Sequence, residues 1–281
     1  MLLSTAASAS DWPRFLGPKG DATALDAKAP LSWSATENIL WRAAVPGPGS
    51  SSPIVHGDKI YLTCWTGYGI DGGQDMSKLT RHLLCYALKD GKLLWKTDIP
   101  AEQPEDPYQG FITEHGYATH TPVTDGKRIY VFFGKSGALA FDMDGKKLWQ
   151  TDLGKGSSSK RWGSAASPIL HDGKLIINAS DESQAIVALD TESGSILWRA
   201  EGEILDSAYG TPAVIKRGDT EDLVLAVPQE VWGLNPDTGK LRWFAVHRLP
   251  GNVSPTVING GEKFFIFGGY PTTGSVAYKV G

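Results

Sequence analysis

Few residues of this sequence have the types and spacing of a catalytic or metal-binding site. His115 and His120 lie close together in the segment HGYATH, and imidazoles are common ligands of divalent metals. A metal site needs at least a third protein ligand, and none is evident near this pair. We therefore predict no metal site from the sequence.

Hydrolytic chemistry has equally little support. Serines are consecutive at 50–52 and at 157–159, but neither run has the glycine-flanked pattern of a nucleophile elbow. Glu114 and Asp206 would act as a carboxylate pair only at a defined separation, which a sequence does not supply. No catalytic residue is predicted.

The composition is that of a soluble globular protein. The chain has 281 residues, of which 41% are hydrophobic and 21% are charged, with a net charge of −4. This charge argues against nucleic-acid binding, which needs a basic surface. No apolar stretch approaches the length that spans a bilayer.

The N-terminal arm, residues 1–32, has two interpretations. Residues 1–10 read MLLSTAASAS, in which Ala7, Ser8 and Ala9 resemble a signal-peptidase site, although a basic segment is absent. The segment is either the remnant of a signal peptide or an unstructured polar arm. The first interpretation implies an extracytoplasmic, bacterial protein, either periplasmic or secreted.

Two sequence patterns recur along the rest of the chain. One is a small or polar residue, a proline and an apolar run, and the other is a turn, apolar residues and a tryptophan. The prolines are Pro53, Pro122, Pro168, Pro212 and Pro255, and the tryptophans are Trp41, Trp95, Trp149, Trp198 and Trp243. Repeats of about 40–50 residues, each with room for four short strands and tight turns, are typical of propeller blades. We assign the tryptophans to docking between blades, because a large flat side chain packs well there.

The repeat also resembles a known family. ALDTESGSILW at 188–198, and nearly GLNPDTGKLRW at 233–243, are similar to the tryptophan-docking motif of pyrroloquinoline-quinone (PQQ)-like repeats. The resemblance covers residues 11–281 and implies an all-β propeller of four-stranded antiparallel blades. It says little about activity, because such repeats occur both in dehydrogenases and in BamB-like scaffolds.

The predicted propeller domain, residues 33–281, does not complete a ring by itself. Blades are expected at about 51–100, 119–153, 166–203 and 210–247, with a partial blade at 253–281 and an unpaired closing strand at 37–47. The resemblance implies eight blades, so we favour a fragment of a larger ring. The alternative is a five-bladed ring that the strand at 37–47 closes.

The long loops are expected on one face. In an up-and-down blade, the turn between the second and third strands lies on the same face as the linker to the next blade. The insertions at 66–80, 101–119 and 154–165 therefore share this face, which favours a binding surface. The candidate ligand- or partner-binding residues there are Glu114, His115, Tyr117, His120, Arg161, Trp162, Asp206, Tyr209 and Asn252.

The two cysteines, Cys64 and Cys85, form no CxxC or haem-attachment motif. If the first blade copies the register of the second, Cys64 faces Cys85 across neighbouring strands. A disulfide is then geometrically possible and would suit an exported protein. Two buried thiols are the alternative.

Two functions follow from the resemblance. The first is a non-catalytic extracytoplasmic scaffold that binds a protein partner or a small ligand at the loop-rich face and needs no cofactor. The second is a PQQ-dependent dehydrogenase, which implies PQQ, calcium held by carboxylate and amide side chains, and a catalytic aspartate. No such constellation can be matched here, although Trp162 could support a quinone, and we favour the scaffold.

Overall fold

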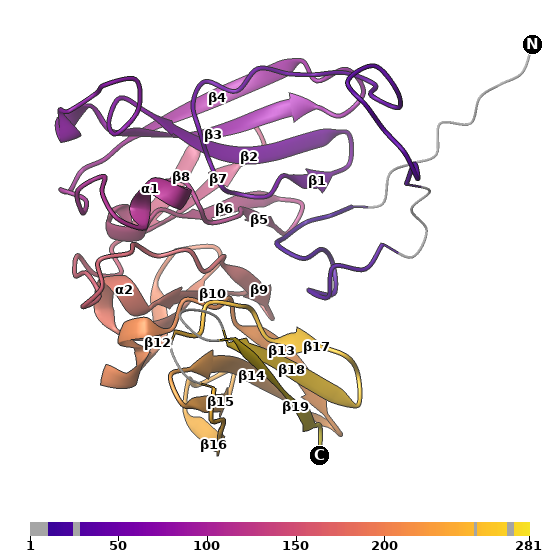
Figure 1. The fold of residues 1–281 in the computed structure, drawn as a ribbon, viewed down its shortest axis with the longest axis vertical. Coiled ribbons are helices and arrows are strands. Elements are labelled where there is room, and N and C mark those ends of the chain that lie inside the picture. Colours follow the sequence, from indigo (N-terminus) through magenta and orange to yellow (C-terminus); the bar gives the residue numbers. More distant parts are fainter. Residues whose placement is uncertain (1–10, 25–28, 250–251, 269–272) are drawn as a thin grey trace, which may run out of the picture.

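The computed structural model describes residues 11–24, 29–249, 252–268 and 273–281. The proposed signal-peptide remnant at 1–10 lies outside the described residues. The described chain is all-β, with five antiparallel sheets in which each strand pairs with its neighbour in sequence. Figure 1 shows these sheets following one another along an arc.

Each sheet corresponds to one expected repeat. The strands of the first two sheets are β1 (Ile54–His56), β2 (Lys59–Thr66), β3 (Thr80–Ala87), β4 (Leu93–Pro100), β5 (Val123–Thr124), β6 (Arg128–Phe132), β7 (Ala138–Asp142) and β8 (Lys147–Thr151). Those of the third and fourth are β9 (Ile169–His171), β10 (Lys174–Ala179), β11 (Ala185–Asp190), β12 (Ile196–Glu201), β13 (Ala213–Arg217), β14 (Thr220–Val227), β15 (Glu230–Leu234) and β16 (Leu241–Val246). The fifth contains β17 (Ile258–Asn259), β18 (Lys263–Gly268) and β19 (Gly274–Lys279).

Side chains that point alternately to the two faces of each inner strand form the core between blades. In β10, Leu175 and Ile177 are buried in a cluster with Tyr130 of the second sheet. Ile176, which points to the other face, is buried in a cluster with Leu223 of the fourth sheet. Successive side chains of a strand point to opposite faces, so a strand between two blades is buried on both faces and is largely apolar.

The tryptophans lie at the contacts between consecutive sheets. Trp198 donates its indole N–H to Pro236 O at 3.0 Å, and its ring lies against Gly239 of the next sheet. A methyl group added at Gly239 would lie 2.5 Å from this ring. The rings of Trp41, Trp95 and Trp149 lie in the same way against Gly91, Gly145 and Gly194.

The segment 37–47, expected as a strand, forms none. Trp41 nevertheless contacts the first sheet, because its indole donates to Leu88 O at 2.9 Å. No sheet of the described residues closes on itself, and the fifth sheet pairs only its own three strands. The backbone of 37–47 thus runs beside the first blade without joining a sheet.

The pairing predicted for Cys64 and Cys85 is wrong. Cys64 lies opposite His82 and Cys85 opposite Tyr61, because β2 and β3 pair from Thr66 and Thr80 at the loop end. The two cysteines pack in separate clusters and are free and buried. The expected register failed because the loop at 66–80 is much longer than the turn from which the register was copied.

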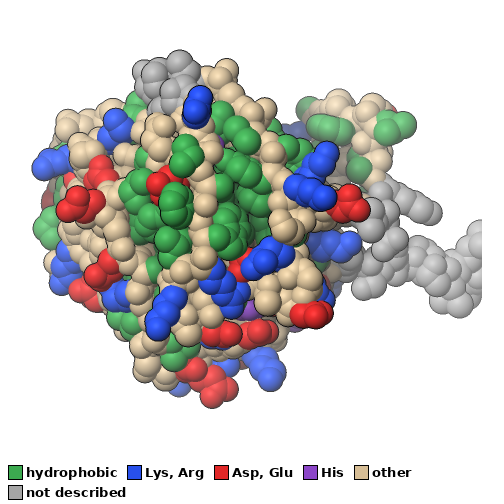
Figure 2. Space-filling model, turned by 90° about the horizontal axis from the view of Figure 1, so that it is seen from below, with side chains coloured by type: hydrophobic (Ala, Val, Ile, Leu, Met, Phe, Trp, Pro, Cys, Tyr) green, Lys and Arg blue, Asp and Glu red, His purple; other side chains and the backbone are tan. Residues whose placement is uncertain are grey.

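The last described blade leaves an apolar groove at the end of the arc. Trp243 donates to Asp222 within its own sheet at 2.8 Å and borders a groove of about 390 Å³ together with Phe264 and Tyr278. Figure 2 shows apolar side chains gathered on this end of the molecule. No helix among the described residues is long and apolar enough to cross a membrane.

Candidate functional site

The long loops lie on one face of the arc, as the strand order requires. Short helices occur there in the connections between second and third strands and in the linkers between blades (Figure 1). They are η1 (Met76–Lys78), α1 (Ile112–His115), η2 (Gly134–Ser136), α2 (Ser180–Ser183) and η3 (Glu203–Ser207). Helix α2 contacts both η2 and η3, so loops of three successive blades meet at one place.

A buried ion pair joins the first two blades beneath these loops. Arg81 Nη2 lies 2.5 Å from Glu105 Oε1, and the two side chains are only 2% and 8% exposed. The same guanidinium donates from Nε to Tyr117 O and from Nη1 to Ser136 Oγ, both at 2.9 Å. Since its three nitrogens each have an acceptor, this buried charge is well compensated.

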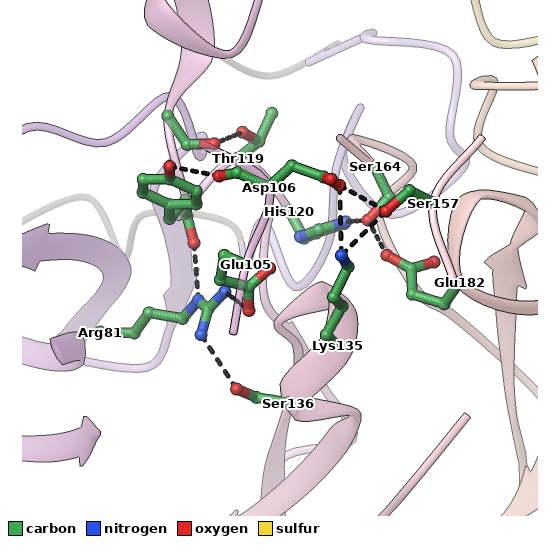
Figure 3. A network of polar contacts seen from close by, with 12 residues as sticks. Arg81, Glu105, Asp106, Thr119, His120, Lys135, Ser136, Ser157, Ser164 and Glu182 are labelled. Carbon is green, nitrogen blue, oxygen red and sulfur yellow. Dashed lines mark hydrogen bonds and ion pairs between the residues drawn. The ribbon is translucent and has the colours of Figure 1, made fainter. Parts of the chain in front are cut away.

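A second ion pair extends the network (Figure 3). Lys135 Nζ lies 3.2 Å from Asp106 Oδ2, and both side chains are about nine-tenths buried. Ser157 bridges them, accepting from Lys135 Nζ at 2.8 Å and donating to Asp106 Oδ2 at 2.7 Å. The linkers 101–119 and 154–165 are thereby tied to each other and to the turn of the second blade.

The innermost part of the network is a chain of three polar residues. Ser164 Oγ lies 3.0 Å from His120 Nε2 and donates to Glu182 Oε1 at 2.5 Å (Figure 3). Because Ser164 has one proton and gives it to Glu182, the His120 Nε2–H must be the donor to Ser164. The remaining polar atoms, His120 Nδ1 and Glu182 Oε2, are buried and have no hydrogen-bond partner among the described residues.

Burial shifts the pKa values of both ends of this chain. It lowers the pKa of His120 to about 3, with the Arg81 charge adding to the effect. It raises the pKa of Glu182 to about 8, with the neighbouring Asp181 carboxylate also raising it. In both groups, loss of hydration disfavours the charged form. At neutral pH the imidazole is uncharged and the carboxyl group is largely protonated.

This arrangement is poorly suited to acid–base or nucleophilic catalysis. An imidazole with a pKa near 3 is a weak base at neutral pH, and the Ser164 proton is directed to Glu182 instead of His120. The cavity between these side chains has a volume of about 30 Å³. That is room for about one water molecule, far below the roughly 300 Å³ at which small-molecule sites begin.

A larger, aromatic pocket opens beside the polar network. Its volume is about 280 Å³, and its walls include Phe15, which the N-terminal segment brings to the loops. We call it the aromatic pocket. Its lining residues are Phe15, His115, Trp162, Gly163, Ala165, Tyr209, Thr211, Ser254 and Thr256.

Trp162 and Tyr209 form one wall of the aromatic pocket. Their rings stack with centroids 5.7 Å apart and planes inclined by 27°. The Lys160 ammonium group lies 5.4 Å from the Trp162 ring centroid, and Arg161 beside it is exposed. His115 holds this loop in place, because its Nε2 lies 2.7 Å from Trp162 O.

The candidate residues from the sequence therefore separate into three groups. His115, Trp162 and Tyr209 line the aromatic pocket, whereas Tyr117 and His120 line the polar cavity behind it. The others lie in neither cavity. Glu114 and Arg161 are exposed, Asn252 is buried, and Asp206 accepts hydrogen bonds from Ser159 N and Ser159 Oγ.

The histidine pair is not arranged for a metal ion. Both ring nitrogens of His115 are engaged, Nδ1 with Thr119 Oγ1 at 2.8 Å and Nε2 with Trp162 O. His120 contributes one nitrogen to Ser164. Neither residue belongs to a group of three metal-ligating side chains in the described part of the chain.

Sequence reasoning missed the charged residues of the network, namely Arg81, Glu105, Asp106, Lys135 and Glu182. A signal was present for two of them. Lys135 and Glu182 occupy equivalent turns, between the second and third strands of consecutive blades. Comparison of these turns across the repeat would have placed both residues at the loop-rich face.

Comparisons with known proteins agree on the repeat. A family model described as outer membrane protein assembly factor BamB matches residues 80–279. A polyvinylalcohol dehydrogenase from Pseudomonas sp is 24% identical over 181 residues, which is 57% of this chain and 24% of that protein.

Two solved structures share the fold at low sequence identity. BamB from Moraxella catarrhalis has a TM-score of 0.57 at 15% identity, over 85% of this chain and 61% of that one. Quinohemoprotein alcohol dehydrogenase from Comamonas testosteroni has a TM-score of 0.61 at 14% identity, over 94% of this chain and 47% of that one. The chain thus spans less than two thirds of each of these proteins.

Proposed function

Because the chain belongs to the BamB-like family of PQQ-type repeat propellers, we propose that it is a non-catalytic scaffold that binds a protein partner at its loop-rich face. One observation carries the proposal. The charged groups beneath this face are buried and bonded to one another, whereas the accessible groups beside the aromatic pocket include Trp162, Lys160 and Arg161. This is the composition of an anchor site for a protein and not that of a reaction centre.

The buried network would give the partner a rigid surface. Buried polar contacts tie parts of this face to another blade or linker, including Arg81 with Glu105 and Ser158 N with Asp181. Loops that are ordered before binding lose little conformational entropy when the partner docks. The network therefore acts as a support for the recognition surface.

The aromatic pocket supplies the recognition element. Trp, Tyr and Arg are the residues that most often dominate binding energy at protein interfaces. Here Trp162 and Tyr209 stack at the wall of a 280 Å³ pocket, and Lys160 and Arg161 extend from the same loop. We propose that an apolar side chain of the partner enters the aromatic pocket while acidic groups of the partner approach Lys160 and Arg161.

The same likeness supports an extracytoplasmic location. The family description names outer-membrane protein assembly, and residues 7–9 have the small-residue pattern of a signal-peptidase site. We propose that the protein acts in the periplasm or outside the cell.

Site-specific crosslinking in cells tests the proposed surface. A photo-reactive amino acid at Arg161 should give a defined protein adduct, whereas the same group at Glu192 should not. Glu192 is a suitable control because its side chain is 79% exposed and lies in a turn on the opposite face. Equal adducts from both positions, or an adduct from Glu192 alone, would contradict the proposal.

The second candidate function is a PQQ-dependent dehydrogenase, which the similarity to polyvinylalcohol dehydrogenase favours. The residues of the loop-rich face do not fit that cofactor. The polar cavity, about 30 Å³, is too small for a tricyclic quinone. Among the described residues, no carboxylate or amide side chain that would hold calcium lines the aromatic pocket.

A binding assay separates the two candidates. The protein is incubated with PQQ and calcium, passed over a gel-filtration column and examined for quinone absorbance. We expect no quinone in the protein fraction. Stoichiometric retention, together with dye reduction by an alcohol, would establish the dehydrogenase instead.

A further inference from the structure

A separate cluster of metal-ligating side chains lies on the face opposite the long loops. His171 is the last residue of β9, and Asp172 follows it in the tight turn to β10. Glu221 is contributed by β14 of the next blade. The cluster therefore spans the junction between the third and fourth blades, and a pocket of about 320 Å³ opens over it.

The local backbone explains how His171 and Asp172 come together. The turn between β9 and β10 has two central residues, Asp172 and Gly173, at φ of +43° and +72°. Positive φ at both positions is typical of the type I′ turn that suits a two-residue hairpin. It places the Asp172 carboxylate beside the imidazole of the preceding residue.

The distances in the cluster match a metal site better than a hydrogen-bonded ion pair. His171 Nε2 lies 3.5 Å from Asp172 Oδ2 and 3.6 Å from Glu221 Oε2, and the three atoms all lie within 4.8 Å of one another. A hydrogen bond between imidazole and carboxylate would be near 2.8 Å. Two ligands at about 2.1 Å from a tetrahedral Zn²⁺ lie about 3.4 Å apart.

Two of the neighbouring cations are engaged by other carboxylates. Arg242 Nη1 lies 2.6 Å from Asp222 Oδ1, and Lys174 Nζ lies 2.9 Å from Asp237 Oδ1, so other carboxylates hold both cations. Lys216 also borders the pocket. The ion pairs that Asp172 and Glu221 make among the described residues are both with His171.

We propose that His171, Asp172 and Glu221 form a binding site for one divalent ion of the zinc class. An imidazole nitrogen favours zinc and related transition ions over Ca²⁺ and Mg²⁺, which prefer all-oxygen sites. Three protein ligands leave the fourth position to water from the open pocket. The bound ion would add a second link between two blades that the Lys174–Asp237 ion pair already joins at this point.

Calorimetric titration with Zn²⁺ tests the site. The chain is first treated with a chelator and exchanged into buffer, and binding is compared with that of His171→Ala and Glu221→Gln. We expect one ion per chain, with affinity at least tenfold weaker in either variant. Ca²⁺ at the same concentrations should give no comparable binding.

His56→Ala is the matched control. His56 ends β1 as His171 ends β9, and it also faces a carboxylate, Asp11, at 2.9 Å. That distance is typical of a hydrogen-bonded pair, and His56 belongs to no group of three metal-ligating side chains in the part of the chain that the structure describes. Zinc binding by His56→Ala should equal that of the unchanged chain.

Thermal unfolding provides a second readout that does not depend on heats of binding. Zinc should raise the melting temperature of the unchanged chain and of His56→Ala, because a ligand of the folded state stabilises it. It should not raise that of His171→Ala. An equal rise in all three proteins, or stoichiometric binding unaffected by His171→Ala and Glu221→Gln, would overturn the proposal.

Discussion

The buried carboxyl group of Glu182 should make the stability of the protein fall between pH 6.5 and pH 8. Its pKa rises from 4.5 to about 8 in the folded state because of burial, so folding requires a proton that the unfolded chain does not hold at these pH values. A group with a raised folded pKa stabilises the fold at low pH. That stabilisation is lost as the pH rises toward the folded pKa.

The size of the effect follows from the two pKa values. Between pH 6.5 and 8 the folded state releases about half of this proton, and the linkage relation gives a loss of roughly 1.5 kcal/mol in the free energy of unfolding. His120 acts in the opposite direction, because burial lowers its pKa from 6.5 to about 3. Its contribution to the free energy of unfolding is nearly complete by pH 6.5, so between pH 6.5 and 8 it adds only about 0.4 kcal/mol.

The assay is urea unfolding followed by tryptophan fluorescence, at pH 6.5, 7, 7.5 and 8. Glu182→Gln is the comparison, since an amide keeps an acceptor for Ser164 Oγ but does not titrate. The unchanged chain should lose roughly 1.5 kcal/mol more than Glu182→Gln across this range, with the denaturant slope unchanged. Equal pH dependence in the two proteins would refute the burial of a protonated Glu182.

Three further predictions concern packing, the buried ion pair and the thiols. Gly239→Ala should lower the free energy of unfolding by about 2–4 kcal/mol, because the new methyl group meets the Trp198 ring and Gly239 has a positive φ. Gly218→Ala is the control, because Gly218 also has a positive φ but a methyl group there would have nothing within 4 Å. In urea unfolding, Gly218→Ala should lower the free energy of unfolding by only about 1 kcal/mol. Arg81→Met should lower the free energy of unfolding by about 3–5 kcal/mol, because it leaves the Glu105 carboxylate buried and unpaired. Burial raises the pKa of both cysteine thiols to about 11, so a thiol reagent should react with neither in the folded protein and with both in urea; fast reaction without urea would contradict their burial.

The strands were predictable because their determinants are local. In the third blade, tight-turn residues separate short apolar runs, and β10 and β11 lie within the blade expected at 166–203. The placement of long loops on one face followed from strand order alone. The register of β2 with β3 was not predictable, because the insertion at 66–80 does not specify which residues pair at its base.

The candidate site was predictable only in part, for a physical reason. His115, Trp162 and Tyr209 lie in linkers, and topology places linkers at one face. Arg81 is the second residue of β3, close to a strand end where a charged residue normally points to solvent, and it is buried by the linker 101–119 and the second blade. Partners that meet across blades depend on tertiary distances, which a repeat pattern does not contain.

The affinity of the crosslinked partner for Trp162→Ala tests the proposed function most directly. Loss of a central aromatic anchor should weaken binding by about 30-fold or more, which corresponds to about 2 kcal/mol. Glu192→Ala, on the opposite face, should change the affinity less than about twofold. If Trp162→Ala binds the partner as tightly as the unchanged chain, the aromatic pocket is not the recognition site.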